Sequence, residues 1–442
     1  MSDAAANAPV AGAGGVVPRR QASDLPIEVV NHIFLYAANI DVATAQKLSG
    51  LAKWTRALLA RTLAYHYRIA HVTEKIINEV HSKLTGPHPP TNRINSMRAL
   101  AIDHTSINIY DDNTPEVPDP EKAAQVILKC ENAKLLFLDT TSAHLLYQEG
   151  DIWANAAALT ICAAHLPPLQ REWDHMPFPP AQSIPYSTPR LHLCPLGIDA
   201  LNFRAFPVAS DASHLALTNP IIAPQDPPRR PEHEHLSRQV VLRLLSAPTF
   251  KRLIIRGSPK TLLRIATNLN APPALFHFQT DPDLDQDELW NSLSDPEHLM
   301  ASDRVRFRLW PPPDADSSLF TSQYDGSVVH PQLLKEWKAA AELQFDDEDA
   351  HRRDHPELYT PPANYEQMTE EEQNALLDRL WEQVSQFQPR LGAPWDDEQG
   401  DLCGISETTI ERLRELVLQH PQYPDPPPSI WAALPQAAGG GP

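Results

Sequence analysis

The sequence predicts an α/β protein: a short N-terminal helical module, a repeated strand-and-helix region, and helical C-terminal segments. Between residues 25 and 58, apolar residues recur at three- and four-residue steps, which is the spacing of one helical face. Short runs with apolar residues two apart return between residues 100 and 309, as strands with one buried face require. Single apolar stripes at helical spacing return after residue 331.

These changes of pattern divide the chain into five expected segments. They are a disordered N-terminus over 1–22, a helical module over 23–75, an α/β region over 76–315, an acidic helical region over 316–430 and a disordered tail over 431–442.

The helical module begins near Pro26, with Ser23 and Asp24 as candidate N-caps and Pro26 in the first turn, where no backbone N–H is needed. Val30 and Ile33 then start an apolar helical face. Further apolar residues follow at Leu48, Leu51, Trp54 and Leu58. Helices this short cannot bury their own apolar faces, so the module is expected to pack against a partner.

One stretch carries a specific pattern: Leu-Pro, a glutamate, an aliphatic pair, and an aliphatic residue followed by an aromatic one. It resembles the first half of an F-box, the adaptor-binding module of cullin-based ubiquitin ligases. Leu48, Leu51, Lys53 and Trp54 resemble the second half, although Ala52 stands where the family commonly has serine and the closing Leu-Trp pair is missing. The resemblance implies that the adaptor-binding residues are Leu25, Pro26, Val29, Val30, Ile33, Phe34, Leu48, Leu51 and Trp54.

The implied partners are a Skp-type adaptor and, through it, a cullin scaffold. Buried aliphatic and tryptophan contacts would anchor the helices in a groove of the adaptor. The segment from Val42 to Val72 has five basic residues and no acid, which suits an acidic adaptor: Lys47, Lys53, Arg56, Arg61 and Arg68. The alternative is that these helices only cap the domain that follows.

The α/β region contains eight short apolar runs. They are centred on Ala101, Phe137, Thr160, His192, Ala216, Ile254, His277 and Arg308. The first apolar positions of the outermost runs, Leu100 and Phe307, are separated by seven intervals over 207 positions, about 30 residues each, a period typical of stacked repeats. Helical stretches expected at 121–130, 236–245 and from Pro259, capped by Ser258, would connect the strands in parallel.

This unit resembles an irregular leucine-rich repeat, although no asparagine follows the strands at the family's fixed offset. The resemblance implies a solenoid; a small doubly wound α/β domain is the alternative. The whole pattern also resembles the large F-box-like families of mushroom-forming fungi. Proline-rich loops of this region contain aromatic and basic residues that would contact a protein target. The alternative is that they only pack the long loops against the domain. These residues are Trp173, Phe178, Tyr186, Arg229 and Arg230.

Charge and motifs exclude several classes of function. The net charge is −19, and residues 331–442 alone carry 8 Lys/Arg against 22 Asp/Glu, which argues against nucleic acid as a partner. No apolar run approaches the length of a membrane span, and four cysteines do not make a disulfide scaffold. His233 and His235 lack a third ligand, and the usual phosphate-binding and nucleophile motifs are missing. We therefore expect no enzyme activity, cofactor or metal, and a cytoplasmic or nuclear protein.

The C-terminal third is expected to contain a helix over 331–344, a helix that follows a capping box at Thr369, and a helix capped by Ser406. They are expected to cover the open end of the repeat region, with partner binding as the alternative. By resemblance, the chain would be the substrate-recognition subunit of a Skp–cullin–F-box ubiquitin ligase. The alternative is a non-catalytic scaffold protein.

Overall fold

The computed structural model divides the chain into two compact units, Met1–Tyr67 and Arg68–Pro442. The described residues are 25–103, 120–139, 156–162, 188–194, 213–218, 245, 249–270, 304–310, 326–360, 362–396 and 402–419. The expected disordered termini, 1–22 and 431–442, lie outside this set.

The first unit consists of α1 (Ile27–Ile40), α2 (Val42–Ser49) and α3 (Lys53–Tyr67). Asp41 caps α2 by accepting a hydrogen bond from the Thr44 backbone N–H at 2.8 Å. Pro26 lies at the N-cap of α1, one position earlier than expected, and its carbonyl accepts from Val29 and Val30. The fully buried core is small and consists of Ala38, Ala45 and Leu59.

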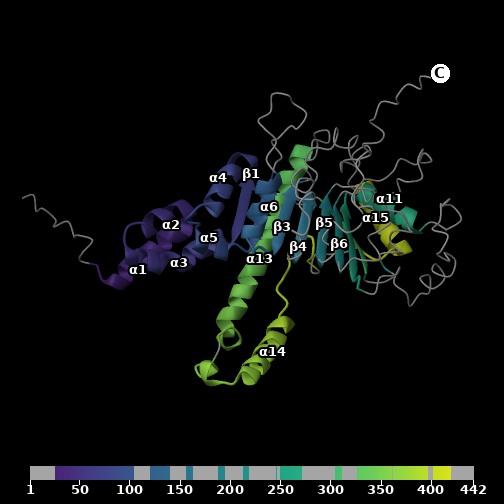
Figure 1. Cartoon of the computed structure of the whole chain (residues 1–442). Helices are drawn as coiled ribbons and strands as arrows, with labels where there is room; N and C mark the ends of the chain where they lie inside the picture. Colours follow the sequence, from purple (N-terminus) through teal and green to yellow (C-terminus); the bar gives the residue numbers. More distant parts are fainter. Residues whose placement is uncertain are drawn as a thin grey trace, which may run out of the picture. The chain divides into compact units, whose positions relative to one another are not determined.

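The second unit contains a nine-stranded sheet whose strands follow one another in chain order (Figure 1). The strands are β1 (Ile69–Thr73), β2 (Ala99–Asp103), β3 (Leu135–Asp139), β4 (Ala158–Cys162), β5 (Arg190–Cys194), β6 (His214–Thr218), β7 (Arg252–Gly257), β8 (Val305–Leu309) and β9 (Leu402–Cys403). All neighbours pair in parallel except β8 and β9. The α/β class is thus confirmed, and an order without reversal among the described strands excludes a doubly wound sheet.

One detail of the expected strand pattern needs correction. Residues 69–73 form β1 of the sheet, so the helical module ends at Tyr67 rather than near residue 75. Its alternation is weak, and Val72 is the one buried side chain of the strand. β7 pairs directly with β8, so no strand lies between them in the sheet. The expected strand at 276–278 and most of the expected helix at 236–245 lie outside the described residues.

One face of the sheet, here called the leucine face, is packed by the connecting helices. Leu100, Leu136, Leu159, Leu191, Leu215 and Leu253 are in register across six consecutive strands. Against this face pack α4 (Glu74–Thr85), α6 (Pro120–Lys129), α11 (Pro259–Asn270) and α15 (Glu407–Gln419), while α5 (Thr91–Ser96) is a short turn before β2. The expected N-cap of α11 is confirmed, because Ser258 Oγ accepts from the Thr261 N–H at 3.2 Å.

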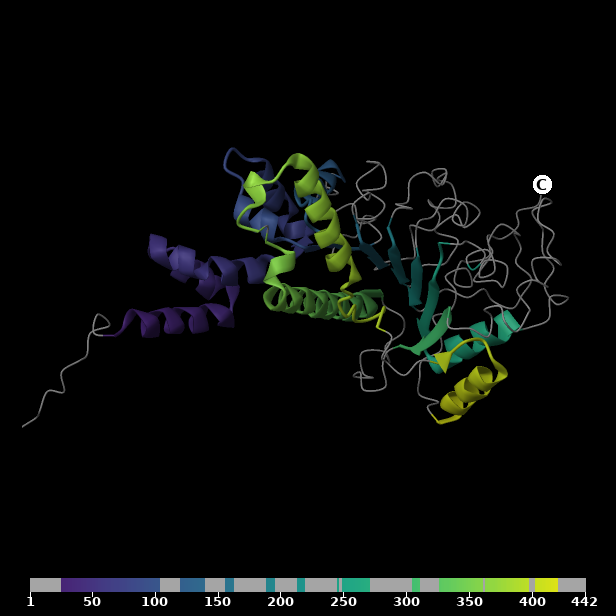
Figure 2. The same cartoon turned by 90° about the horizontal axis from the view of Figure 1, so that it is seen from below.

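The opposite face is covered by α13 (Gly326–Asp354), the long helix that crosses the strands in Figure 1 and runs along the sheet in Figure 2. Leu333, Trp337 and Phe345 of this helix pack with strand residues of the opposite face. Several strand positions there are alanines, including Ala99 and Ala101, and their small side chains let a helix approach the sheet closely. The expectation that this helix would cover the end of the repeat region was therefore wrong.

Ion pairs hold α13 near both ends of the sheet. Arg68, just before β1, donates to Asp346 at 2.8 Å, and Arg98, just before β2, pairs with Glu348 and lies over the Phe345 ring. Toward the other end, Glu336 accepts from Arg256 Nη2 and from Trp310 Nε1, both at 2.8 Å. Because Arg68 is only 4% exposed and belongs to the second unit, it is not part of a basic surface on the helical module.

The remaining C-terminal elements partly follow expectation. The expected capping box precedes α14 (Glu370–Gln386): Thr369 and Glu372 cap each other's backbone. Phe387, just after α14, stacks on His351 near the end of α13, with ring centroids 4.0 Å apart. Ser406 caps α15, which packs against α11 on the leucine face next to β9. Thus α15, unlike α13, lies near the last described strands.

Candidate functional site

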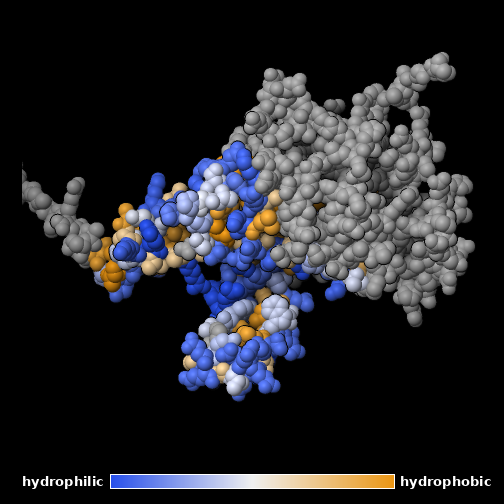
Figure 3. All heavy atoms as spheres, in the orientation of Figure 1, coloured by the Kyte–Doolittle hydropathy of each residue, from blue (hydrophilic) through white to orange (hydrophobic). Residues whose placement is uncertain are grey.

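The helical module exposes an unusual share of apolar surface. Of the fifteen large apolar side chains that are exposed among the described residues, ten belong to this unit. They are Leu25, Ile27, Val29, Ile33, Tyr36, Ile40, Val42, Leu51, Trp54 and Tyr65, and Figure 3 shows apolar residues on this part of the surface. Contiguous apolar patches on otherwise charged surfaces mark sites of interaction with other proteins.

The predicted adaptor-binding residues fall into two groups. Leu25, Pro26, Val29, Ile33, Leu51 and Trp54 are exposed, and the exposed fractions of Ile33 and Leu51 are 51% and 67%. Val30, Phe34 and Leu48 are half-buried; Leu48 packs against the small core of the module. The rings of Phe34 and Trp54 are 5.5 Å apart, so α1 and α3 contribute to one surface. On α1, positions 29, 33, 36 and 40 form a single stripe.

The module is mildly basic. Between residues 25 and 67 it has four Lys/Arg and two Asp/Glu, a balance of +2. The pKa of Asp41 is lowered chiefly by the hydrogen bond from the Thr44 backbone, and this carboxylate is engaged in capping α2. The apolar stripe therefore belongs to a unit with a small excess of basic residues, which lie on α2 and α3.

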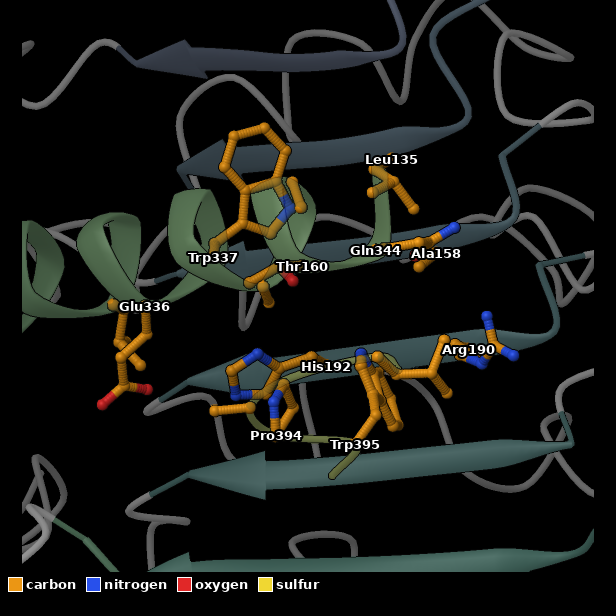
Figure 4. A pocket seen from close by; sticks show the side chains of 15 residues that line it. Leu135, Ala158, Thr160, Arg190, His192, Glu336, Trp337, Gln344, Pro394 and Trp395 are labelled. Carbon is orange, nitrogen blue, oxygen red and sulfur yellow. The ribbon is translucent and has the colours of Figure 1, made fainter. Parts of the chain in front are cut away.

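A second feature is a small pocket on the opposite face of the sheet in the second unit (Figure 4). Its floor is formed by β3, β4 and β5, and its sides by α13 and by the segment 391–395. The cavity volume is about 30 Å³, which holds roughly two water molecules. This is far below the roughly 300 Å³ or more of typical cofactor and substrate pockets. The pocket can therefore take a small chemical group but not a whole cofactor.

The segment 391–395 is fixed by close contacts. Gly392 has a φ of +63°, and a side chain there would meet the backbone of Ala340 on α13. Arg390, just before it, pairs with Asp347 through two hydrogen bonds of 2.6 and 2.9 Å. The Pro394 carbonyl accepts from Arg308 Nη1 at 2.6 Å. Together these contacts position Trp395 over the strands, edge-on to His192 and His214.

Arg190 is the one charged side chain lining this pocket that has no partner among the described residues. The other lining charge, Glu336, is engaged by Arg256 and Trp310. Arg190 Nε is buried without a hydrogen bond, and burial lowers the pKa of this guanidinium. Arg190 and Trp395 both line the pocket, and Figure 4 shows their side chains. The pocket thus presents one uncompensated positive group within largely apolar walls.

His192 should make the stability of the second unit depend on pH. It is 3% exposed, and burial first and Arg256 second hold its pKa well below the ordinary value of 6.5. Below that value the unfolded chain takes up a proton that the folded chain does not, so stability is lost as pH falls. This residue contributes a slope of at most about 1.4 kcal/mol per pH unit.

Urea denaturation at pH 7.0 and pH 5.5 measures this effect. We expect His192→Gln to reduce the difference in unfolding free energy between the two pH values, whereas a change at the exposed His88, His88→Gln, should preserve it. An unchanged difference in His192→Gln would contradict the assignment.

The structure does not describe several residues that the sequence singled out. The predicted target-binding residues Trp173, Phe178, Tyr186, Arg229 and Arg230 lie outside the described residues, as do His233 and His235. Within the described ranges, no three His, Cys, Asp or Glu side chains form a group that could hold a metal. No described helix has the length and apolarity needed to cross a bilayer. Cys162 and Cys194 lie in register on β4 and β5 without a disulfide.

Sequence reasoning missed the pocket. A usable signal was present, because Arg190 and His192 occupy the alternate positions of a strand whose other positions are leucines. Polar residues at such positions are typical of a face exposed to solvent, whereas α13 covers this face. No protein-family model, curated protein or solved structure matches this chain. The functional proposal therefore depends on the residues themselves.

Proposed function

We propose that this chain is the target-binding subunit of a Skp–cullin–F-box-type ubiquitin ligase. The helical module would dock on a Skp-type adaptor, and the α/β region would hold a protein target while partner subunits transfer ubiquitin. The protein would have no catalytic residues of its own and would work in the cytoplasm or nucleus. The observation that carries the proposal is the exposed apolar stripe on α1, together with Leu51 and Trp54, on a module that also matches the order of an F-box pattern.

The physical support lies in the small core of the module. Three fully buried residues cannot account for so many apolar side chains. Five of the ten that are left exposed are residues that the resemblance assigns to the adaptor: Leu25, Val29, Ile33, Leu51 and Trp54. Burying such a stripe stabilises a complex by about 25 cal/mol for each Å² removed from water. Basic residues of α2 and α3 would steer an acidic adaptor toward the module.

The α/β region supports a leucine-rich-repeat-like solenoid. Parallel strands in chain order, with leucines in register and helices on the leucine face, are what repeated units of this kind produce. Its departure from a simple solenoid is α13, which covers the opposite face. A target would therefore bind beside α13 rather than across an open sheet.

Capture of an adaptor tests the proposal. A purified Skp-type adaptor from a mushroom-forming fungus, immobilised on a sensor, should bind the full chain. The double variant Val29→Asp plus Ile33→Asp should weaken binding by 100-fold or more, because two charges would have to be buried in an apolar interface. Both side chains are exposed, so circular dichroism should show an unchanged fold.

A matched control separates specific docking on the adaptor from nonspecific binding through exposed apolar residues. Leu377 and Trp381 are exposed apolar residues of α14, and Leu377→Asp plus Trp381→Asp should leave adaptor binding unchanged. If the wild-type chain does not bind the adaptor, or if the α1 variant binds as well as the wild type, the scaffold alternative replaces this proposal.

A further inference from the structure

We propose that the pocket beside Arg190 binds a carboxylate group of a partner polypeptide. That this polypeptide is a ligase target rests on the proposed function above; the binding itself does not. The site would bind a single acidic side chain or a C-terminal carboxylate between the sheet, α13 and the 391–395 segment.

The first reason is the state of Arg190. Its Nε is buried and makes no hydrogen bond, and no ion pair joins this guanidinium to any described residue. Arg190 is half-buried, and its buried Nε has lost contact with water without gaining a partner, which costs stability; such a residue marks a place where a bound group completes the pairing. A guanidinium presents Nε and Nη as a flat fork that matches the two oxygens of a carboxylate.

The second reason is the set of charges around the pocket. Glu336, the acid that lines it, is held by Arg256 and Trp310, and His192 shares a hydrogen bond of 2.8 Å with Thr218. Burial and Arg256 favour the neutral form of His192, so it does not repel a cation beside it. The acids farther along α13 have partners of their own: Asp346, Asp347, Glu348 and Asp349 pair with Arg68, Arg390 or Arg98. None of these five acids is therefore available to Arg190.

The third reason is size and wall chemistry. A cavity of about 30 Å³ suits a planar carboxylate and excludes a nucleotide. Leu135, Ala158, Ala340, Pro394 and Trp395 provide apolar walls for the methylene carbons that precede a side-chain carboxylate. A phosphate would need more donors than one guanidinium, as in sites built from several backbone N–H groups. Polypeptide chemistry fits these walls better than an inorganic anion.

Direct binding to the full chain tests the proposal. Tryptophans are labelled with fluorine, and the Trp395 resonance is assigned with Trp395→Phe. Four probes are titrated: acetyl-glutamic acid amide, acetyl-alanine, acetyl-glutamine amide and inorganic phosphate. We expect one or both of the carboxylates to shift the Trp395 resonance with saturation at millimolar concentration, and the neutral glutamine probe to leave it unmoved. The glutamate probe reports a side-chain source and acetyl-alanine a C-terminal one.

Three variants complete the experiment. Arg190→Gln should weaken carboxylate binding at least tenfold, and Arg190→Lys, which keeps the charge without the fork, should weaken it less. Arg379→Gln, at an exposed position of α14 outside the pocket, should have no effect. The midpoint temperature of Arg190→Gln should stay at or above that of the wild type, because a half-buried charge without a partner is removed.

The proposal is overturned by any of three results: no shift of Trp395 with either carboxylate, carboxylate binding that survives Arg190→Gln, or binding of phosphate alone. These outcomes are independent of adaptor capture, which is measured on the other unit. Loss of adaptor binding with retained carboxylate binding would remove the ligase function and leave a peptide-binding protein.

Discussion

Replacing Glu336 with glutamine is expected to lower the free energy of unfolding of the second unit by about 3 kcal/mol. The two oxygens of Glu336 accept from Arg256 and Trp310, whereas glutamine offers one oxygen and a competing NH₂ group. Arg256 is 5% exposed, so its charge would remain buried without a counterion. Guanidinium denaturation followed by circular dichroism measures the change.

The control lies on the same helix. Glu342 is exposed, and Glu342→Gln removes the same charge from α13 without touching the Arg256 pair, so its unfolding free energy should stay within about 0.5 kcal/mol of the wild type. Equal destabilisation by the two variants would show that the net charge of α13, and not the buried pair, holds the helix on the sheet.

Replacing Gly392 with alanine is expected to detach the 391–395 segment from α13. The φ of +63° costs a residue with a side chain about 1 kcal/mol or more, and the added Cβ would lie 2.7 Å from Ala340 Cα. Because the backbone of α13 is held by its own hydrogen bonds, we expect the 391–395 segment to move instead. This movement would break the hydrogen bond from Arg308 to the Pro394 carbonyl and expose Trp395. The total loss of stability should be about 2 kcal/mol or more.

Acrylamide quenching of tryptophan fluorescence measures this movement, with Trp395→Phe used to assign the change. Gly50→Ala is the matched control, because Gly50 has a φ of −76° at the end of α2 and its added Cβ meets no atom closer than 3.4 Å. That variant should leave quenching unchanged. If Gly392→Ala behaves in the same way, the tight approach to Ala340 does not position the segment.

Much of the fold was predictable because the sequence pattern is local. Runs such as Leu191-His192-Leu193 alternate over a few residues, and the structure places them as strands whose leucines share one face. The caps at Thr369 and Ser406 were predictable for the same reason, since a cap and its helix lie within four residues. β1 was missed because its single buried residue, Val72, leaves no alternation to detect.

The position of α13 was not predictable from local pattern. Its apolar stripe shows that it packs against something, but its partners lie far away: Arg68 and Asp346 are separated by 278 positions. The alanines against which α13 packs, such as Ala101, do not distinguish a buried strand position from an exposed one in the sequence. For the same reason the Arg190 pocket could not be predicted, whereas the apolar stripe of α1 could, because its residues are close neighbours in the sequence.

The position of α13 along the sheet also affects how the second unit should unfold. In a stack of repeats each unit touches only its neighbours, so the array can fray from one end while the rest survives. Here one helix links Arg68, before β1, to Arg256 on β7 and Trp310 after β8. Loss of either end removes contacts shared by the whole row of strands. We therefore expect the second unit to unfold as one body rather than to fray from one end.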